Sequence, residues 1–409
     1  MSQFWRNVGT ALAGTALAQI IPVAGTLVLA RQYAPTEFGI YSVWLGVVLF
    51  LGVVLTGRFE TALAIVPDGE PRRLAALSTL VTTVLAAGVF AVVCAIGIFL
   101  MPGIADHLPP AMVALLIPTG LLIAAAQTWQ SWAAAEGRYR QLSLMRVIQA
   151  ASVTLGQIAI GVFDSSATML ALAHAVGGGA GLAWSFYVMP SGRFPPRQAR
   201  ETIVKFWREH YRFPTLSLPA GAINTAAAQL PVLLVAGRFG ADVAGLLALT
   251  MRTLGAPIGL LGKSVLDVFK RHAATGYRER GECRAEYVRT FRVLAFASLA
   301  FCAVMAVISE PFFAVAFGEN WREAGTIAVW LLPLFALRFV ASPLSYMVYI
   351  AEKQHIDLVW QLALLVITIA TLNIPDNHTI ALQAYSAGYS LLYIIYLSLS
   401  YRFSLGNCR

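Results

Sequence analysis

Twelve apolar stretches, each long enough to cross a bilayer, constrain this chain more than any other feature of its sequence. A transmembrane helix needs about 20 mostly apolar residues, and backbone polar groups inside lipid must be satisfied within helices or closed barrels. The pattern predicts an all-α integral membrane protein with about 12 transmembrane helices. The predicted spans are Thr10–Ala30, Phe38–Val66, Leu74–Met101, Ala111–Ala134, Met145–Phe163, Thr168–Met189, Leu216–Ala236, Val243–Gly262, Val293–Phe317, Ala324–Ile350, Leu358–Leu372 and Ile380–Tyr401.

The composition agrees with a chain that lies mostly in lipid. Hydrophobic residues make up 58% of the 409 residues and charged residues 12%, against about 25% charged residues in soluble domains. This excludes a soluble enzyme. The four cysteines are far apart and lack the spacing of zinc ligands, so neither a structural metal nor a disulfide framework is predicted. Phosphate-binding and dinucleotide-binding motifs are also missing, and no cofactor is predicted.

Lysine and arginine lie mainly on one side of the predicted membrane. Twelve spans place both termini on the same side, and the even-numbered loops and termini hold 23 of the 29 basic residues. The odd-numbered loops hold only Arg31, Arg238 and Arg322. Basic residues favour cytoplasmic loops, so both termini are predicted to be cytoplasmic. The net charge of +9 then reflects topology, and no nucleic acid is expected as a partner.

The two halves of the chain resemble one another weakly. Residues 28–41 are similar in residue class to residues 234–247, and Ala135-Glu136 recurs as Ala351-Glu352. A duplication of six spans predicts two pseudo-symmetric six-helix lobes around a central cavity, with chance similarity of apolar segments as the alternative. The predicted lobes are residues 1–190 and 214–409. Residues 191–213 form a predicted cytoplasmic linker that ends in a short surface helix.

Three arginines lie within the predicted spans, where a charge costs about 2.5–3.5 kcal/mol. They are Arg58, Arg252 and Arg338. Because guanidinium groups grip phosphates in a bidentate manner, these arginines predict a cavity that prefers an anionic head group. Alternatively, they bind groups on neighbouring helices and only hold the bundle together. Glu60 is an embedded acid, and its i,i+2 spacing on a helix argues against a simple ion pair with Arg58.

Uncharged polar residues add a second, weaker pattern. Gln127, Gln149 and Asn224 lie within or beside predicted spans. In a wet cavity their amide groups would bind sugar hydroxyls, whereas between helices they would hydrogen-bond neighbouring helices. Both interpretations remain open.

Several segments also resemble a known family. Residues 30–41 (ARQYAPTEFGIY), 57–65 (GRFETALAI), 72–80 and 135–139 (AEGRY) are similar to the motifs of bacterial polysaccharide biosynthesis proteins. These are the Wzx-type flippases of lipid-linked oligosaccharides, in the superfamily of multidrug, oligosaccharidyl-lipid and polysaccharide exporters. The similarity in span layout covers the whole chain, and the motifs are concentrated in the first 150 residues.

The resemblance implies an alternating-access flippase rather than an enzyme. It implies that an undecaprenyl-pyrophosphate-linked oligosaccharide, such as an O-antigen (lipopolysaccharide), capsule or exopolysaccharide unit, moves from the cytoplasmic to the outer leaflet of the bacterial inner membrane. Arg58 and Arg252 match pyrophosphate-binding arginines of relatives on spans two and eight. Span one lacks the third such arginine, and Arg338 is expected to replace it. Glu60 is the candidate for coupling to a sodium or proton gradient, and a polysaccharide polymerase and other assembly proteins are expected partners.

Two other functions fit parts of the pattern. A cation-coupled multidrug antiporter would share the fold, but a basic interior disfavours cationic drugs. A membrane-bound glycosyl transferase or O-antigen polymerase needs catalytic carboxylates on an external loop. The predicted external loops are short and carry only isolated acids, so this function ranks last.

Overall fold

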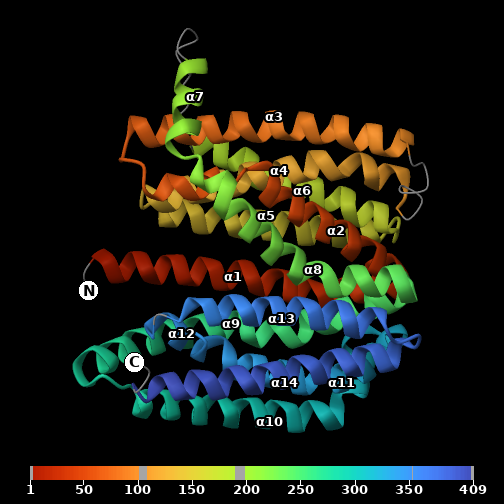
Figure 1. The fold of residues 1–409 in the computed structure, drawn as a ribbon. Coiled ribbons are helices and arrows are strands. Elements are labelled where there is room, and N and C mark those ends of the chain that lie inside the picture. Colours follow the sequence, from red (N-terminus) through yellow and green to blue (C-terminus); the bar gives the residue numbers. More distant parts are fainter. Residues whose placement is uncertain (1–2, 101–107, 189–198, 352, 407–409) are drawn as a thin grey trace. The chain divides into compact units, whose positions relative to one another are not determined.

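The computed structural model describes residues 3–100, 108–188, 199–351 and 353–406, and within these ranges it contains helices and turns but no strand. The all-α prediction is therefore confirmed. The longer helices (Figure 1) are α1 (Gln3–Gln32), α2 (Pro35–Leu55), α3 (Glu70–Leu100), α4 (Pro110–Ala135), α5 (Tyr139–Gly161), α6 (Ala167–Val188), α7 (Ala199–Glu209), α8 (Leu218–Phe239), α9 (Ala241–Arg280), α10 (Arg284–Phe317), α11 (Arg322–Leu344), α13 (Gln354–Asn373) and α14 (His378–Ser404). The shorter ones are η1 (Phe59–Ala64), η3 (Phe213–Ser217), η4 (Glu319–Trp321) and α12 (Met347–Ile350).

Every predicted span overlaps one of these helices or two consecutive ones, and the second span also includes the turn at residues 56–58. The end residues Met101 and Met189 lie outside the described residues. Within the described ranges, ten helical stretches are long and apolar enough to cross a membrane. The first predicted span lies in α1, which is apolar over Ala16–Gln32. The eighth lies in the first half of α9, which continues as a helix to Arg280. Residues 263–292, which lie between the predicted spans eight and nine, are thus largely helical.

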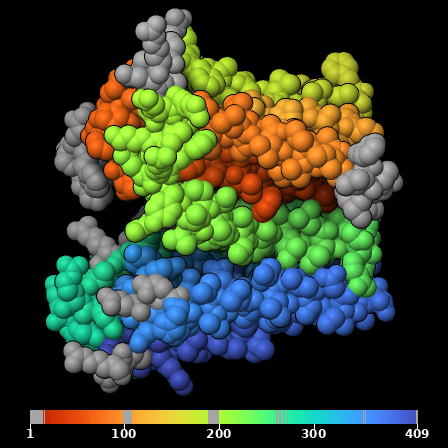
Figure 2. All heavy atoms as spheres, turned by 45° about the horizontal axis from the view of Figure 1, so that its top comes forward, coloured from red at the N-terminus to blue at the C-terminus, as the bar shows by residue number. Residues whose placement is uncertain are grey.

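Packing divides the chain into two compact units, Met1–Gln229 and Leu230–Arg409. The predicted lobe boundaries at residues 190 and 214 stay a prediction. The first part of the predicted linker, residues 191–198, lies outside the described residues. Its second part contains α7, the expected short helix, which crosses α3 (Figures 1 and 2) and donates a hydrogen bond from Trp207 Nε1 to Thr82 Oγ1 at 2.8 Å.

In the first unit, α5 packs between α1 and α6. Small residues permit this close approach: a Cβ on Gly177 of α6 would lie 2.5 Å from the backbone nitrogen of Val153. Glycine at such contacts is typical of membrane helices, because lipid gives no hydrophobic driving force and close backbone packing must hold the helices together. Nearby, the Tyr41 hydroxyl contacts His174 Nδ1 at 2.8 Å and accepts a hydrogen bond from Gln157 at 2.9 Å.

In the second unit, α11 packs against α9, α10 and α14. Thr250 on α9 donates a hydrogen bond to the carbonyl of Ala324 on α11 at 2.9 Å, and Ser298 on α10 donates one to Ala336 at 3.0 Å. The turn between α9 and α10 is fixed to the end of α14 by the bond from Cys283 N to Ser404 O at 2.9 Å. These bonds satisfy polar groups inside the apolar helix bundle.

Candidate functional site

The predicted second span does not continue as one helix. Helix α2 ends at Leu55. After Thr56, both Gly57 and Arg58 have left-handed backbone conformations, with φ of 58° and 61°. Glycine adopts this conformation freely, whereas an arginine pays about 1–2 kcal/mol. The surrounding structure holds Arg58 there: its N–H donates to Thr56 Oγ1 at 3.2 Å, and its carbonyl accepts from the Thr61 hydroxyl at 2.6 Å.

This turn brings Arg58 and Glu60 together. Arg58 Nη1 lies 3.4 Å from Glu60 Oε1, so the prediction that the i,i+2 spacing argues against a simple ion pair is wrong. The prediction assumed an α-helix, in which side chains two positions apart diverge. The left-handed residue and the following 3₁₀-helix η1 turn the two side chains to the same side. The Glu60 side chain is 5% exposed and the Arg58 side chain 32% exposed, so a buried carboxylate supports an arginine that is partly accessible.

A glycine of α8 makes room for the Arg58 side chain. A Cβ on Gly221 would lie 3.1 Å from Arg58 Nε, which is tighter than an ordinary contact. Asn224 lies three residues later, on the same face of the helix, and its side chain is exposed. The structure thus brings Arg58 and Glu60 together and places Asn224 one helical turn from the Arg58 contact. Within the described chain, Arg58 Nε and Glu60 Oε2 are buried without a hydrogen-bond partner.

A buried arginine fixes the segment that carries this pair. Arg72 Nε donates to the carbonyl of Leu63 in η1 at 2.9 Å, and Nη2 donates to that of Val66, two residues after η1, at 2.7 Å. Its Nη1 donates to the Ala135 carbonyl and to the Glu136 carboxylate, each at 3.1 Å. Arg72 therefore joins three of the sequence motifs, those at residues 57–65, 72–80 and 135–139.

The other two predicted polar residues of this unit lie at separate helix contacts. A Cβ on Gly52 of α2 would lie 3.6 Å from Gln127 Nε2 on α4, and one on Gly181 of α6 would lie 2.8 Å from Gln149 Cβ on α5. Both glutamines are half-buried. Their surroundings are those of residues between helices, and their proposed role in binding sugar stays a prediction.

One embedded arginine was missed by the sequence analysis. Arg146 lies in the second turn of α5, within a helix long and apolar enough to span the membrane. Its Nε donates to Gln130 Oε1 of α4 at 3.1 Å. The sequence indicates this position, because Arg146 is the second residue of the predicted fifth span. Its place at the end of that span groups it with the basic residues of the preceding loop.

In the second unit, Arg252 and Arg338 lie on two helices that pack together, α9 and α11. A Cβ on Gly255 would lie 3.8 Å from the ring of Phe335, so Gly255 and Phe335 lie at about the same height along the two helices. Arg252 precedes Gly255 by three residues and Arg338 follows Phe335 by three. The two helices run in the same direction, so the rise of 1.5 Å per residue separates the arginines by about 9 Å along the helices.

Arg338 is exposed, and its guanidinium lies 6.0 Å from the centroid of the Phe335 ring. The Arg252 side chain is half-buried. Both cations lie in the apolar part of the unit at different depths. The described residues contain no cluster of His, Cys, Asp or Glu that is suited to a metal ion.

The fold defines the class of protein to which the chain belongs. It is similar to the lipid II flippase MurJ in an inward closed conformation, with a TM-score of 0.68 and 12% identity over 95% of this chain and 87% of that one. It is also similar to an inward-facing multidrug resistance MATE transporter of the MOP superfamily, with a TM-score of 0.63 and 12% identity over 97% of this chain and 94% of that one. A third similar structure is a point mutant of the Vibrio cholerae MATE transporter VcmN, with a TM-score of 0.56 and 14% identity over 98% of this chain and 95% of that one.

The chain is therefore a multi-pass membrane protein with the fold of MOP-superfamily transporters. Residues 28–326 match the family model described as polysaccharide biosynthesis protein. The protein belongs to this family, as the motifs had indicated. No curated protein sequence matches the chain. Family and fold point to a membrane flippase or exporter.

Proposed function

We propose that this protein is a flippase that moves an undecaprenyl-pyrophosphate-linked oligosaccharide from the cytoplasmic to the outer leaflet of the bacterial inner membrane. The observation that carries the proposal is the ion pair of Arg58 and Glu60, in which about a third of the Arg58 side chain is accessible. A guanidinium is suited to a pyrophosphate because its donors match two phosphate oxygens at once. Membership of the polysaccharide biosynthesis family supports a glycan as the cargo.

Three arginines are proposed to bind the charged head group of the cargo. Arg58 binds the pyrophosphate in one half of the protein, while Arg252 and Arg338 provide positive charge in the other, in an alternating-access cycle with a cationic cavity. Gln127, Gln149 and Asn224 are proposed to contact the glycan, and a polysaccharide polymerase is a proposed partner. The protein makes no covalent change to its cargo in this scheme, and both termini are cytoplasmic.

The ion pair also suggests how transport is coupled to an ion gradient. Without substrate, Glu60 balances the charge of Arg58. When a pyrophosphate engages Arg58, the buried Glu60 carboxylate needs another positive charge, since an unpaired charge is costly in a membrane interior. We propose that a proton or a sodium ion then binds Glu60, and that its departure on the other side restores the pair.

The test is the sidedness of the lipid-linked glycan in cells that lack this protein. A membrane-impermeant sugar probe added to spheroplasts should detect outward-facing glycan only when the wild-type protein is restored. Arg58→Ala should leave the glycan facing the cytoplasm at normal protein levels, whereas Arg208→Ala, an exposed arginine of α7, should restore export. Normal export by Arg58→Ala would remove the proposed site.

A multidrug antiporter is the second candidate, favoured by the similarity of the fold to a multidrug resistance MATE transporter. Such a transporter needs an acid that exchanges a cation for a cationic drug, and Glu60 is the buried acid that the sequence nominates in the first unit. Its pairing with Arg58 at 3.4 Å disfavours this role. Drug resistance on overexpression, lost in Glu60→Gln, would favour the antiporter over the flippase.

A further inference from the structure

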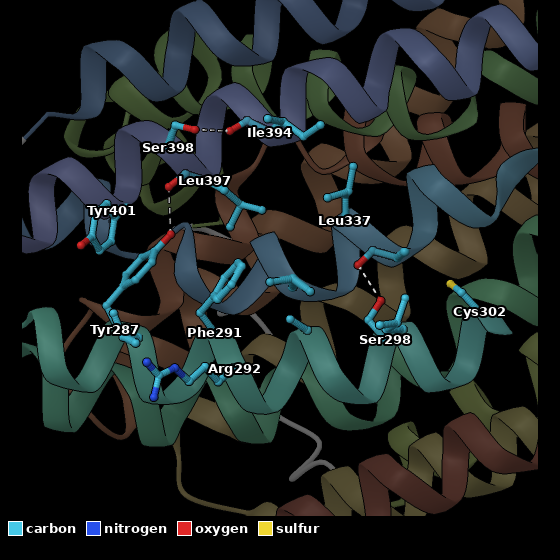
Figure 3. A pocket seen from close by; sticks show the side chains of 15 residues that line it. Tyr287, Phe291, Arg292, Ser298, Cys302, Leu337, Ile394, Leu397, Ser398 and Tyr401 are labelled. Carbon is cyan, nitrogen blue, oxygen red and sulfur yellow. Dashed lines mark hydrogen bonds between the residues drawn. The ribbon is translucent and has the colours of Figure 1, made fainter.

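An apolar groove of about 710 Å³ lies in the second unit, between α10, α11 and α14. This volume is in the range of small-molecule sites. Figure 3 shows Phe291 of α10 and Leu397 of α14 projecting into the space between these helices. None of the proposed substrate-binding residues lines it.

Three polar side chains of the groove already have hydrogen-bond partners within the protein. The Tyr287 hydroxyl donates to the Leu397 carbonyl at 3.0 Å, Ser298 donates to Ala336 at 3.0 Å, and Ser398 donates to Ile394 at 2.8 Å (Figure 3). A hydrophilic guest would therefore find few groups to bind. An apolar chain would instead fill the groove and regain the van der Waals contacts that an empty groove forgoes.

The groove is long enough to hold an acyl chain that spans one lipid leaflet. Along α10 it extends from Tyr287 to Cys302, a rise of about 22 Å, whereas one leaflet contributes about 15 Å of hydrocarbon. Its wall includes Leu299, which is 71% exposed, and Ile394, which is 51% exposed. Both helices belong to the stretches that are apolar enough to span a membrane, so the groove is open to acyl chains.

One end of the groove carries a positive charge. Arg292 lines this end and is exposed, and Figure 3 shows its guanidinium directed toward the Tyr287 end. The nearby acid on α10, Glu286, is held by Arg280 at 2.5 Å. Tyrosine and arginine at the end of a span are typical of the membrane interface, and the sequence predicts this end to face the anionic cytoplasmic leaflet.

We propose that this groove holds an anionic phospholipid, with an acyl chain between α10, α11 and α14 and the phosphate at Arg292. The site is separate from the embedded arginines, and the proposal does not rest on the transport activity. The bound lipid would fill the groove and contact all three helices.

The test is native mass spectrometry of the full-length protein purified from membranes and exchanged into equal amounts of phosphatidylglycerol and phosphatidylcholine. The wild type should retain phosphatidylglycerol with an excess of about fivefold, the effect of one basic residue near the surface. Arg292→Gln should abolish the excess. Arg289→Gln, on the same helix but outside the groove, should keep it.

A second pair of variants tests the acyl site. Ala295→Phe places a ring in the groove and should remove retained lipid of both kinds, whereas Ala303→Phe, an exposed position of α10 outside the groove, should not. Equal retention of the two lipids by the wild type would overturn the proposal, as would an excess that survives Arg292→Gln. Displacement of phosphatidylglycerol by an equal concentration of undecaprenyl phosphate would assign the groove to a different lipid.

Discussion

Arg58 and Glu60 form an ion pair across a left-handed turn, with 3.4 Å between Nη1 and Oε1. The pair depends on the backbone of Arg58, the only non-glycine residue with positive φ in the described chain. Strained residues of this kind persist where surrounding contacts over-determine them, and they cluster at functional sites. The pair therefore gives the first unit its candidate binding group.

The space around Arg58 provides the first prediction. Gly221→Ala would place a Cβ 3.1 Å from Arg58 Nε, so the Arg58 side chain must give by a few tenths of an ångström. We expect glycan export to fall by about threefold, because a misplacement of about 1 Å can cost about a hundredfold and this shift is smaller. Gly237→Ala is the control on the same helix, since a Cβ there meets nothing within 4 Å. Equal export by the two variants would show that the Arg58 position is unimportant.

Glu60 provides a prediction about coupling. Glu60→Gln removes the charge that competes with a phosphate for Arg58, so the purified protein should bind the lipid-linked glycan at least as tightly as the wild type. Export should nevertheless be lost, because the site no longer responds to an ion gradient. Glu310→Gln, an exposed acid of α10 that accepts a bond from Thr326, is the control. Export by Glu60→Gln with unchanged ion dependence would exclude the proposed coupling role.

Arg72 provides a prediction about stability. Its side chain is 6% exposed and binds the carbonyls of Leu63, Val66 and Ala135. A lysine has no planar fork with which to reach all of them, so Arg72→Lys should destabilise the protein by about 2 kcal/mol through unsatisfied buried carbonyls. A lower melting temperature in detergent would report this loss. Arg73→Lys, which changes a partly exposed arginine paired with Glu70, should melt like the wild type.

Cys283 provides a prediction about pH. Burial raises the pKa of this thiol to about 11, and its Sγ lies 3.3 Å from the sulfur of Met347. Because only the thiolate reacts, labelling by a maleimide at pH 8 should be about a hundredfold slower than for a thiol of pKa 9, and should rise with pH up to about 11. A cysteine introduced at the exposed neighbouring position by Glu282→Cys, in a Cys283→Ser background, is the control. Comparable labelling rates at pH 8 would contradict the buried position of Cys283.

The sequence by itself determined the all-helical membrane architecture and the approximate positions of the spans, and it singled out three arginines within apolar stretches. It did so because runs of about 20 apolar residues have few options in lipid other than a helix, and because charges within such runs are rare enough to be noticed. The motifs likewise identified the family, which the match over residues 28–326 confirmed.

Only the tertiary structure decided how the side chains meet. The ion pair of Arg58 with Glu60 requires a left-handed residue that helical periodicity does not anticipate. The bond from Arg146 to Gln130 joins two consecutive helices, and the space left by Gly221 brings Arg58 against a helix that is distant in the chain. The groove between α10, α11 and α14 likewise exists only when three helices are packed together. The physical reason is that a span is specified by local hydrophobicity, whereas contacts between spans depend on the shapes of both partners.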